Sequence, residues 1–324
     1  MNFNANQIRP SSNVGMQPQL LAYDVSRDDG MNIGRNTGDG TVPPGGSITY
    51  RWYAGDLARD PATDRLIATP VEFGTVNLLP ADTIEQGLKG LGAVLVVEPA
   101  GATWTTDANT RTAATVTSPS VTFREFVVMT QGSVNLRDRN GNPICPTAGA
   151  GAETVAACQG ADDAEESGNQ AVNYRSEPMW FRLGYDPGAP LEQTRNVDTT
   201  NAVSNTQVGG DPATPVFTAK AGTAVRFRIG ESAGHFRNGV FNVHGHVWQR
   251  EPYVAGSVAS QSIGNNPQSE YRGVQEGLGT GNHFDIVFQN GAGGAFKVPG
   301  DYLVRDQASF ELDNGRWGLL RVQP

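Results

Sequence analysis

The pattern of apolar and polar positions along the chain is that of a β protein. Residues 47–53 alternate β-forming side chains with others, and residues 92–99 form a continuous apolar run that ends in Glu-Pro. Short runs of this kind, bounded by Gly, Pro and Asp turn signals, predict strands rather than helices. The only helix-like stretch of the first half, within residues 80–87, is long enough for one or two turns.

Strand patterns continue through the second half of the chain. They predict strands at residues 121–129, 178–183, 215–220, 224–229, 239–249, 283–289, 300–304 and 317–322. Because these strands are short and regularly spaced, we predict an all-β fold built as antiparallel Greek-key sandwiches. Residues 138–172 are rich in small and acidic residues, which predicts a loop excursion. We therefore expect two domains, at residues 1–118 and 119–324, with the excursion inside the second.

Composition agrees with this fold class and narrows the function. The 324 residues include 40 Gly and 20 Pro, and only 18% are charged, which is typical of a turn-rich β protein. The formal net charge of -9 would repel a phosphate backbone, so we expect no nucleic acid partner. No apolar run is long enough to predict a membrane span, and no signal peptide is visible at the start of the sequence.

The two cysteines, Cys145 and Cys158, lie close together within the predicted excursion. A disulfide between them would close a short loop and contribute about 2–3 kcal/mol to stability. It would also fit an oxidising compartment, so we expect an extracellular or periplasmic protein. Two free thiols are the alternative.

Histidines give the clearest chemical signal in the sequence. All four, His235, His244, His246 and His283, lie in one segment of the second half, and histidine is the commonest protein ligand of transition metals. Two residues apart on an extended strand, His244 and His246 would point to the same face and could bind one metal ion. His235 and His283 are the further candidate ligands. The alternative for each histidine is a structural role, with the imidazole hydrogen-bonded inside the fold.

Several segments of the second half resemble the closing domain of the multicopper oxidases. They are residues 215–229, 241–249, 300–309 and 314–322. The first half resembles a related cupredoxin domain at residues 42–53 and 87–97. The large bacterial members of the family, which include manganese oxidases, are the most similar. The resemblance implies two cupredoxin-like β-sandwich domains, the first of which lacks its N-terminal strands.

The resemblance also implies a copper site. His244 and His246 match the His-x-His pair that these oxidases contribute to a trinuclear copper cluster, where dioxygen is reduced to water. The first histidine of the fuller family motif falls at Phe241, which cannot bind a metal. Copper is therefore the expected cofactor, in a site that is incomplete within this chain.

A second copper centre of the family has no counterpart in this sequence. Where the family carries a His-Cys-His stretch, this chain has Arg305, Asp306 and Gln307, and the axial ligand positions fall near Glu311 and Arg316. A blue copper centre requires a thiolate ligand. The resemblance thus implies that the electron-entry site of an oxidase would have to come from another domain.

Two functions follow from these observations. In the first, the chain is the C-terminal portion of a multicopper-oxidase-like protein, binds copper through His244 and His246, and contributes to oxidation of a metal ion or phenol. Its partners would be upstream cupredoxin domains or a separate subunit, and a homo-oligomer is also open. In the second, the chain is a non-catalytic cupredoxin that acts as a scaffold or interaction module and has lost its copper centres.

Overall fold

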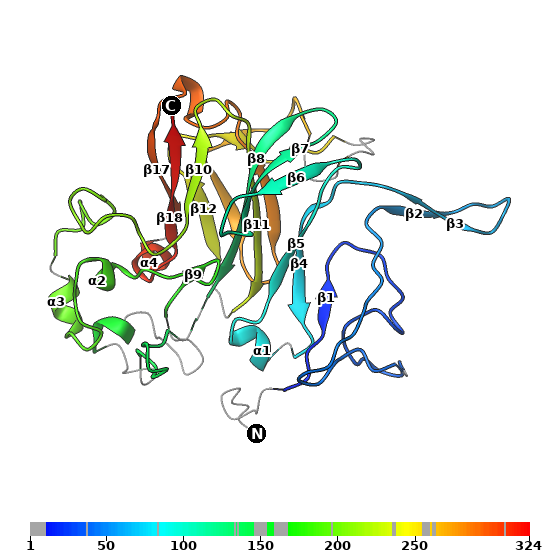
Figure 1. The fold of residues 1–324 in the computed structure, drawn as a ribbon, viewed down its shortest axis with the longest axis horizontal. Coiled ribbons are helices and arrows are strands. Elements are labelled where there is room, and N and C mark those ends of the chain that lie inside the picture. Colours follow the sequence, from blue (N-terminus) through cyan, green and yellow to red (C-terminus); the bar gives the residue numbers. More distant parts are fainter. Residues whose placement is uncertain are drawn as a thin grey trace.

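The structure is a computed structural model, and most of its regular secondary structure is β-strand (Figure 1). It describes residues 11–36, 38–82, 84–132, 134, 136–145, 154–158, 168–195, 197–234, 238–254, 260, 264–307 and 309–324. Within these residues, no helix is long and apolar enough to cross a membrane. The predicted all-β fold class is confirmed.

The larger sheet of the main sandwich has six strands. Five of them follow the order β16 (His283–Val287), β11 (Val225–Ala233), β8 (Thr122–Gln131), β7 (Ala113–Thr117) and β6 (Thr103–Thr106). The short β9 (Ala171–Val172) also pairs with β8. β11 is central, parallel to β8 and antiparallel to β16. This sheet therefore joins segments that are far apart in the sequence.

The second sheet of the sandwich has five strands. Their order is β10 (Val216–Lys220), β18 (Trp317–Gln323), β17 (Gly300–Asp306), β12 (Gly239–Val243) and β15 (Val274–Leu278). Apolar side chains from the inner faces of both sheets form one core, including Phe126, Phe227 and Ile229 from the larger sheet and Phe217 and Phe241 from the smaller. Alternation of apolar residues along each strand places them on this inner face.

The first half of the chain contributes a small sheet that packs on the outer face of the larger one. Its order is β1 (Met16–Pro18), β4 (Gly74–Pro80) and β5 (Ala93–Val97). The outer face of β11 carries Gly230, where an added Cβ would lie 2.5 Å from the Asn77 side chain and 2.8 Å from Val94. Glycine is needed there because the two sheets approach each other so closely.

A buried ion cluster holds the small sheet against the larger one. Arg228, on the outer face of β11, is fully buried and contacts four carboxylates, those of Glu72, Glu98, Glu125 and Asp285. Two of these acids come from the first half of the chain and two from the larger sheet, at nitrogen–oxygen distances of 2.6–3.1 Å. The guanidinium therefore links the two halves across their interface.

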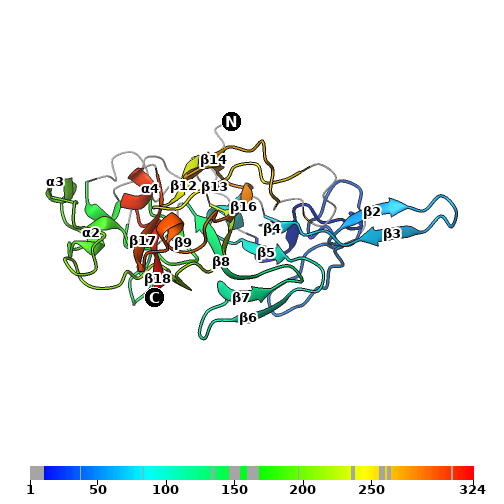
Figure 2. The same ribbon diagram turned by 90° about the horizontal axis from the view of Figure 1, so that it is seen from above.

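Two strand pairs lie outside these sheets. β2 (Asp56–Arg59) and β3 (Leu66–Thr69) form an exposed hairpin that extends away from the rest of the chain (Figures 1 and 2). β13 (Trp248–Gln249) pairs with β14 (Tyr271–Arg272). Residues 47–53, predicted to be a strand, contain only an isolated bridge from Tyr53 to Ala22. The strand prediction was wrong here, because among the described residues no strand lies alongside residues 47–53 to form a ladder with them.

The helices within the described residues are short. They are α1 (Glu85–Leu88), α2 (Met179–Arg182), α3 (Leu191–Arg195) and α4 (Ser309–Asp313), with 3-10 turns at Ala156–Cys158 and Gly294–Phe296. The helical turn expected within residues 80–87 is confirmed by α1. The strand predicted at residues 178–183 is instead α2, because one helical turn buries Met179 and Trp180 and lets Arg182 bond Glu177.

Hydrogen bonding runs across the expected boundary between residues 118 and 119. β6 and β7 precede this boundary, yet they pair in register with each other and β7 pairs with β8. The division into two domains stays a prediction. The first strand along the sequence that belongs to the larger sheet is β6, which begins at Thr103.

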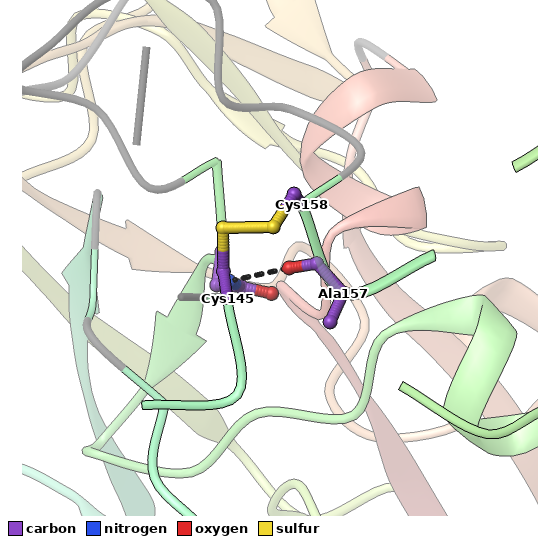
Figure 3. Close-up of a disulfide and its surroundings, with 4 residues drawn as sticks. Cys145, Ala157 and Cys158 are labelled. Atoms are coloured by element: carbon purple, nitrogen blue, oxygen red, sulfur yellow. Dashed lines mark hydrogen bonds between the residues drawn. A yellow bond between two sulfur atoms is a disulfide. The ribbon is translucent and has the colours of Figure 1, made fainter. Parts of the chain in front are cut away.

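The predicted excursion carries a disulfide. Cys145 and Cys158 are bonded, next to Ala157 (Figure 3). Ala156, Ala157 and Cys158 are buried, so this turn of the excursion packs against the fold, whereas residues 138–143 are exposed. The expectation of a disulfide, rather than of two free thiols, is confirmed.

Candidate functional site

His244 and His246 lie in a turn and not on an extended strand. β12 ends at Val243, and β13 begins only at Trp248. Gly245, between the two histidines, has a φ of 69°, a left-handed conformation that glycine adopts without strain. A Cβ at Gly245 would also lie 3.2 Å from the Tyr302 ring. The predicted side-by-side arrangement on one strand face was therefore wrong, because this glycine turns the chain.

His246 is held inside the fold by both of its ring nitrogens. Its Nε2 accepts a hydrogen bond from the backbone N–H of Gly293 at 3.0 Å. Its Nδ1 lies 2.8 Å from the His244 carbonyl oxygen. Because Nε2 accepts, the proton of the neutral ring lies on Nδ1, which donates to that carbonyl. Both nitrogens through which an imidazole could bind a metal ion are thus occupied.

The surroundings of His246 are aromatic. Its side chain is only 3% exposed, stacks on Phe288 at 4.1 Å between ring centroids and meets Tyr302 edge-on at 4.8 Å. Burial lowers the pKa of His246, and the hydrogen bond to the His244 carbonyl opposes that shift. The ring therefore packs as a neutral core residue.

The two other histidines that the structure describes, His244 and His283, do not join His246. His244 is exposed, and burial and Arg305 both lower its pKa. His283 begins β16 and pairs with Gly230, whereas Phe288, on which His246 stacks, follows the other end of that strand. Five residues of strand separate these positions by about 16 Å. Burial also lowers the pKa of His283, and His235 lies outside the described residues.

The positions that the resemblance assigns to a blue copper centre hold a buried ion cluster. Asp306, at the end of β17, accepts the backbone N–H of Val240 at 3.0 Å and lies 2.5 Å from Arg316 Nη2. Glu311 and Glu231 lie 3.7 and 3.8 Å from the same guanidinium. A fixed cation, Arg316, thus sits among the carboxylates that occupy this region.

Glu231 is the most deeply buried acid of this second cluster. It is fully buried on β11, and the Thr130 hydroxyl donates a hydrogen bond to it. Burial raises the pKa of Glu231 to about 8, against the opposing effect of Arg316. We therefore expect this carboxyl to hold a proton near neutral pH.

These residues do not fit a copper ion in this arrangement. Across the part of the chain that the structure describes, no three side chains of His, Cys, Asp or Glu are placed to hold a metal ion. Both cysteines are in the disulfide. The His-x-His pair offers one exposed imidazole and one whose nitrogens are both hydrogen-bonded.

Comparison with known proteins bears on the fold. No protein-family model matches this sequence, and no curated protein matches it. A solved multicopper oxidase is similar over 96% of this chain and 70% of its own, with 15% identity and a TM-score of 0.51. The multicopper oxidase mgLAC is similar over 97% and 71%, with 12% identity and the same TM-score of 0.51. This chain has the multicopper oxidase fold.

The shared fold covers both halves of the chain, so the expected cupredoxin-like sandwich architecture is confirmed. The blue copper oxidase of Nitrosomonas europaea is also similar, over 96% of this chain and 69% of its own, with 12% identity and a TM-score of 0.45. The expected likeness to manganese oxidases in particular stays a prediction. At 12–15% identity, the likeness to these oxidases shows a shared arrangement of strands. The chemistry of the site has to be argued from the residues of this chain.

Sequence reasoning missed the Arg228 cluster. Arg226 and Arg228 alternate with Val225, Phe227 and Ile229 on β11, so the sequence does place both arginines on one face. Their carboxylate partners Glu72 and Glu98 lie more than 100 positions away. The alternation indicates that both arginines share one face of the strand. It does not indicate whether that face is buried or exposed.

Proposed function

We propose that this chain is a non-catalytic cupredoxin-fold module that acts as a scaffold or interaction unit in a larger assembly. The observation that carries the proposal is the state of His246, whose two ring nitrogens bond Gly293 and His244. A histidine bound in this way stabilises a turn. To coordinate copper through Nε2, the ring would have to give up the hydrogen bond from Gly293 and leave its packing against Phe288 and Tyr302.

The Arg316 cluster supports the same proposal. In the region where the resemblance would place a blue copper centre, a guanidinium supplies positive charge to Asp306 and nearby carboxylates. The cation that balances these carboxylates is thus a side chain of the chain itself. The fold is thus stabilised there by an ion pair.

A second candidate function is copper binding. In it, the chain would be the C-terminal portion of a multicopper-oxidase-like protein, with copper at His244 and His246 contributing to dioxygen-reducing oxidation of a metal ion or phenol. It is favoured by the fold shared with two multicopper oxidases over nearly the whole chain and by the exposure of His244. Copper would then be shared with a neighbouring domain.

Both candidates require a partner, which we propose to be upstream cupredoxin domains or a separate subunit. The β2–β3 hairpin supports this part of the proposal, because it exposes Leu57, Leu66 and Ile67 on a projecting arm (Figure 2). The disulfide supports an extracellular or periplasmic location.

Copper analysis tests the proposal. The purified chain is loaded with copper, freed of loosely bound metal and compared with His244→Ala and His246→Ala, alone and in complex with its assembly partner. We expect well below one copper per chain, with no change in either variant. One equivalent of copper that both substitutions abolish would contradict the proposal and support the second candidate.

Size-exclusion chromatography of the chain with the product of a neighbouring gene tests the partner. We expect co-elution that Ile67→Asp weakens, whereas Asp64→Asn, in the exposed turn of the same hairpin, leaves it unchanged. Elution of the chain as a stable monomer that unfolds in one cooperative step would count against an obligatory partner.

A further inference from the structure

A large cleft lies between the small sheet and the outer face of the larger one, lined by residues of β5, β6, β7 and β8. Its volume of about 810 Å³ is in the range of small-molecule sites. Apolar side chains from both sheets form most of its walls: Val94, Val96, Val116, Val127 and Met129. Trp104, at its side, is 64% exposed.

Two acids from opposite walls meet in this cleft. Glu98 follows β5 and Glu125 lies on β8, and each side chain is only 10% exposed. Arg228, behind them, donates to Glu98 at 2.6 Å and to Glu125 at 2.9 Å. One guanidinium thus serves both carboxylates from the side away from the cleft.

The buried cluster around Arg228 has more acids than bases. Its four carboxylates face two guanidinium groups, those of Arg228 and Arg226. On the side away from the cleft, the acids receive hydrogen bonds from other residues. Arg226 donates to Glu72 at 2.8 Å, and the Thr75 hydroxyl donates to Asp285 at 2.9 Å. The excess of negative charge therefore falls on the cleft side.

Glu98 shows this excess directly. Its Oε2 is buried and receives no hydrogen bond from an N–H or hydroxyl group among the residues that the structure describes, so an ionised Glu98 would lack a donor at this oxygen. Burial, followed by the hydrogen bond with Glu125, raises the pKa of Glu98 to about 8. Two carboxyl groups can share a hydrogen bond only when a proton lies between them. At neutral pH the proton between Glu98 and Glu125 is the hydrogen-bond donor that these two acids share. A ligand with a cationic donor group could take its place.

We propose that this cleft binds a small organic amine with an apolar body, whose ammonium group lies between Glu98 and Glu125. The ammonium N–H groups would donate to the unsatisfied Glu98 oxygen and to Glu125, and the apolar body would pack along the valine-lined walls and Trp104. On binding, the proton shared by the two acids leaves to solvent, so charge balances as one cation replaces another.

Tyr174 and Arg111, two other polar residues of the cleft, do not compete for this position. The Tyr174 hydroxyl is 2.9 Å from each of the Gly90 and Gly92 carbonyl oxygens, to which it donates. Arg111 also lines the cleft and is exposed to solvent. The two buried acids are therefore the anchor, and the ligand is a monocation rather than an anion.

Calorimetric titration with 2-phenylethylamine tests this site, and 2-phenylethanol, which has the same body without the charge, is the matched ligand. We expect the amine to bind at least tenfold more tightly than the alcohol. Titrations at pH 7 in buffers of different ionisation enthalpy should show release of up to one proton per amine bound. Equal binding of the two ligands, or no binding of either, would overturn the proposal.

Variants locate the binding. Glu98→Gln should weaken amine binding at least tenfold and abolish proton release, whereas Glu270→Gln, the same change at an exposed acid outside the cleft, should leave both unchanged. Trp104→Ala changes an exposed side chain and should weaken the amine about threefold with the fold intact. Binding by Glu98→Gln with the affinity and proton release of the unaltered chain would refute the site, as would a tenfold loss in Glu270→Gln.

Discussion

Replacement of His246 by alanine separates a structural histidine from a copper ligand. The substitution removes a buried ring, its donation to the His244 carbonyl and its acceptance from Gly293. If the ring serves the fold, the loss will appear in the stability of the metal-free chain. If it serves copper, the metal-free chain will change little and copper affinity will fall.

The magnitude follows from the contacts. The Gly293 N–H is buried and would lose its acceptor, which costs about 1–3 kcal/mol. The ring also leaves a cavity between Phe288 and Tyr302, and removal of a large buried side chain costs about 3–5 kcal/mol, part of it the same lost contacts. We expect His246→Ala to lower the free energy of unfolding by roughly 3–5 kcal/mol.

Urea unfolding followed by tryptophan fluorescence measures this change, with His244→Ala as the matched control. His244 is exposed, so its loss should change the free energy of unfolding by about 0.5 kcal/mol or less. A loss below about 1 kcal/mol for His246→Ala, or equal losses in both variants, would refute the structural role argued for His246.

Three further outcomes follow from the buried charges and the disulfide. Arg228→Met should cost about 3–5 kcal/mol of unfolding free energy in urea, because four buried carboxylates lose one of the two guanidinium groups that balance them. The Glu231 pKa of about 8 lies above its ordinary value of 4.5, so stability should fall as pH rises from about 5 to 8, and Glu231→Gln should flatten that dependence. Replacement of Cys145 and Cys158 together by serine should cost about 2–4 kcal/mol in thermal or urea unfolding.

Each of these outcomes has a result that would contradict it. For Arg228, the contrary result is an unfolding free energy within about 1 kcal/mol of the unaltered chain. For Glu231, the contrary result is a free energy of unfolding that rises between pH 5 and 8 in the unaltered chain but not in Glu231→Gln. For the cysteines, the contrary result is that the unaltered chain unfolds identically with its disulfide intact and after reductant has reduced it.

Much of the fold could be predicted from the sequence. The strands β8, β10, β11, β17 and β18 were predicted because their side chains alternate or run continuously apolar, and burial on one or both faces imposes that pattern. The helix α2 was missed because Trp180 and Phe181 favour strands in isolation. Packing of Trp180 in the interior and the Arg182–Glu177 ion pair decide the conformation there, and neither is a local property.

The site was harder to predict than the fold. The spacing of His244 and His246 was visible, but its meaning depended on the backbone between them, and Gly245 adopts a positive φ. The glycine was a sign that the chain could turn at this point. The acids Glu98 and Glu125 lay in runs predicted as strands, and only the packing of β5 against β8 brings them to one cleft.

The structural role of His246 is tested by the nitrogen-15 spectrum of the histidine side chains, recorded at pH 7 with one equivalent of reduced copper under anaerobic conditions. We expect His246 to keep a proton on Nδ1 and a hydrogen-bonded, unprotonated Nε2, with shifts identical to those without copper. Displacement of the His244 and His246 ring signals together, complete at one equivalent, would contradict it.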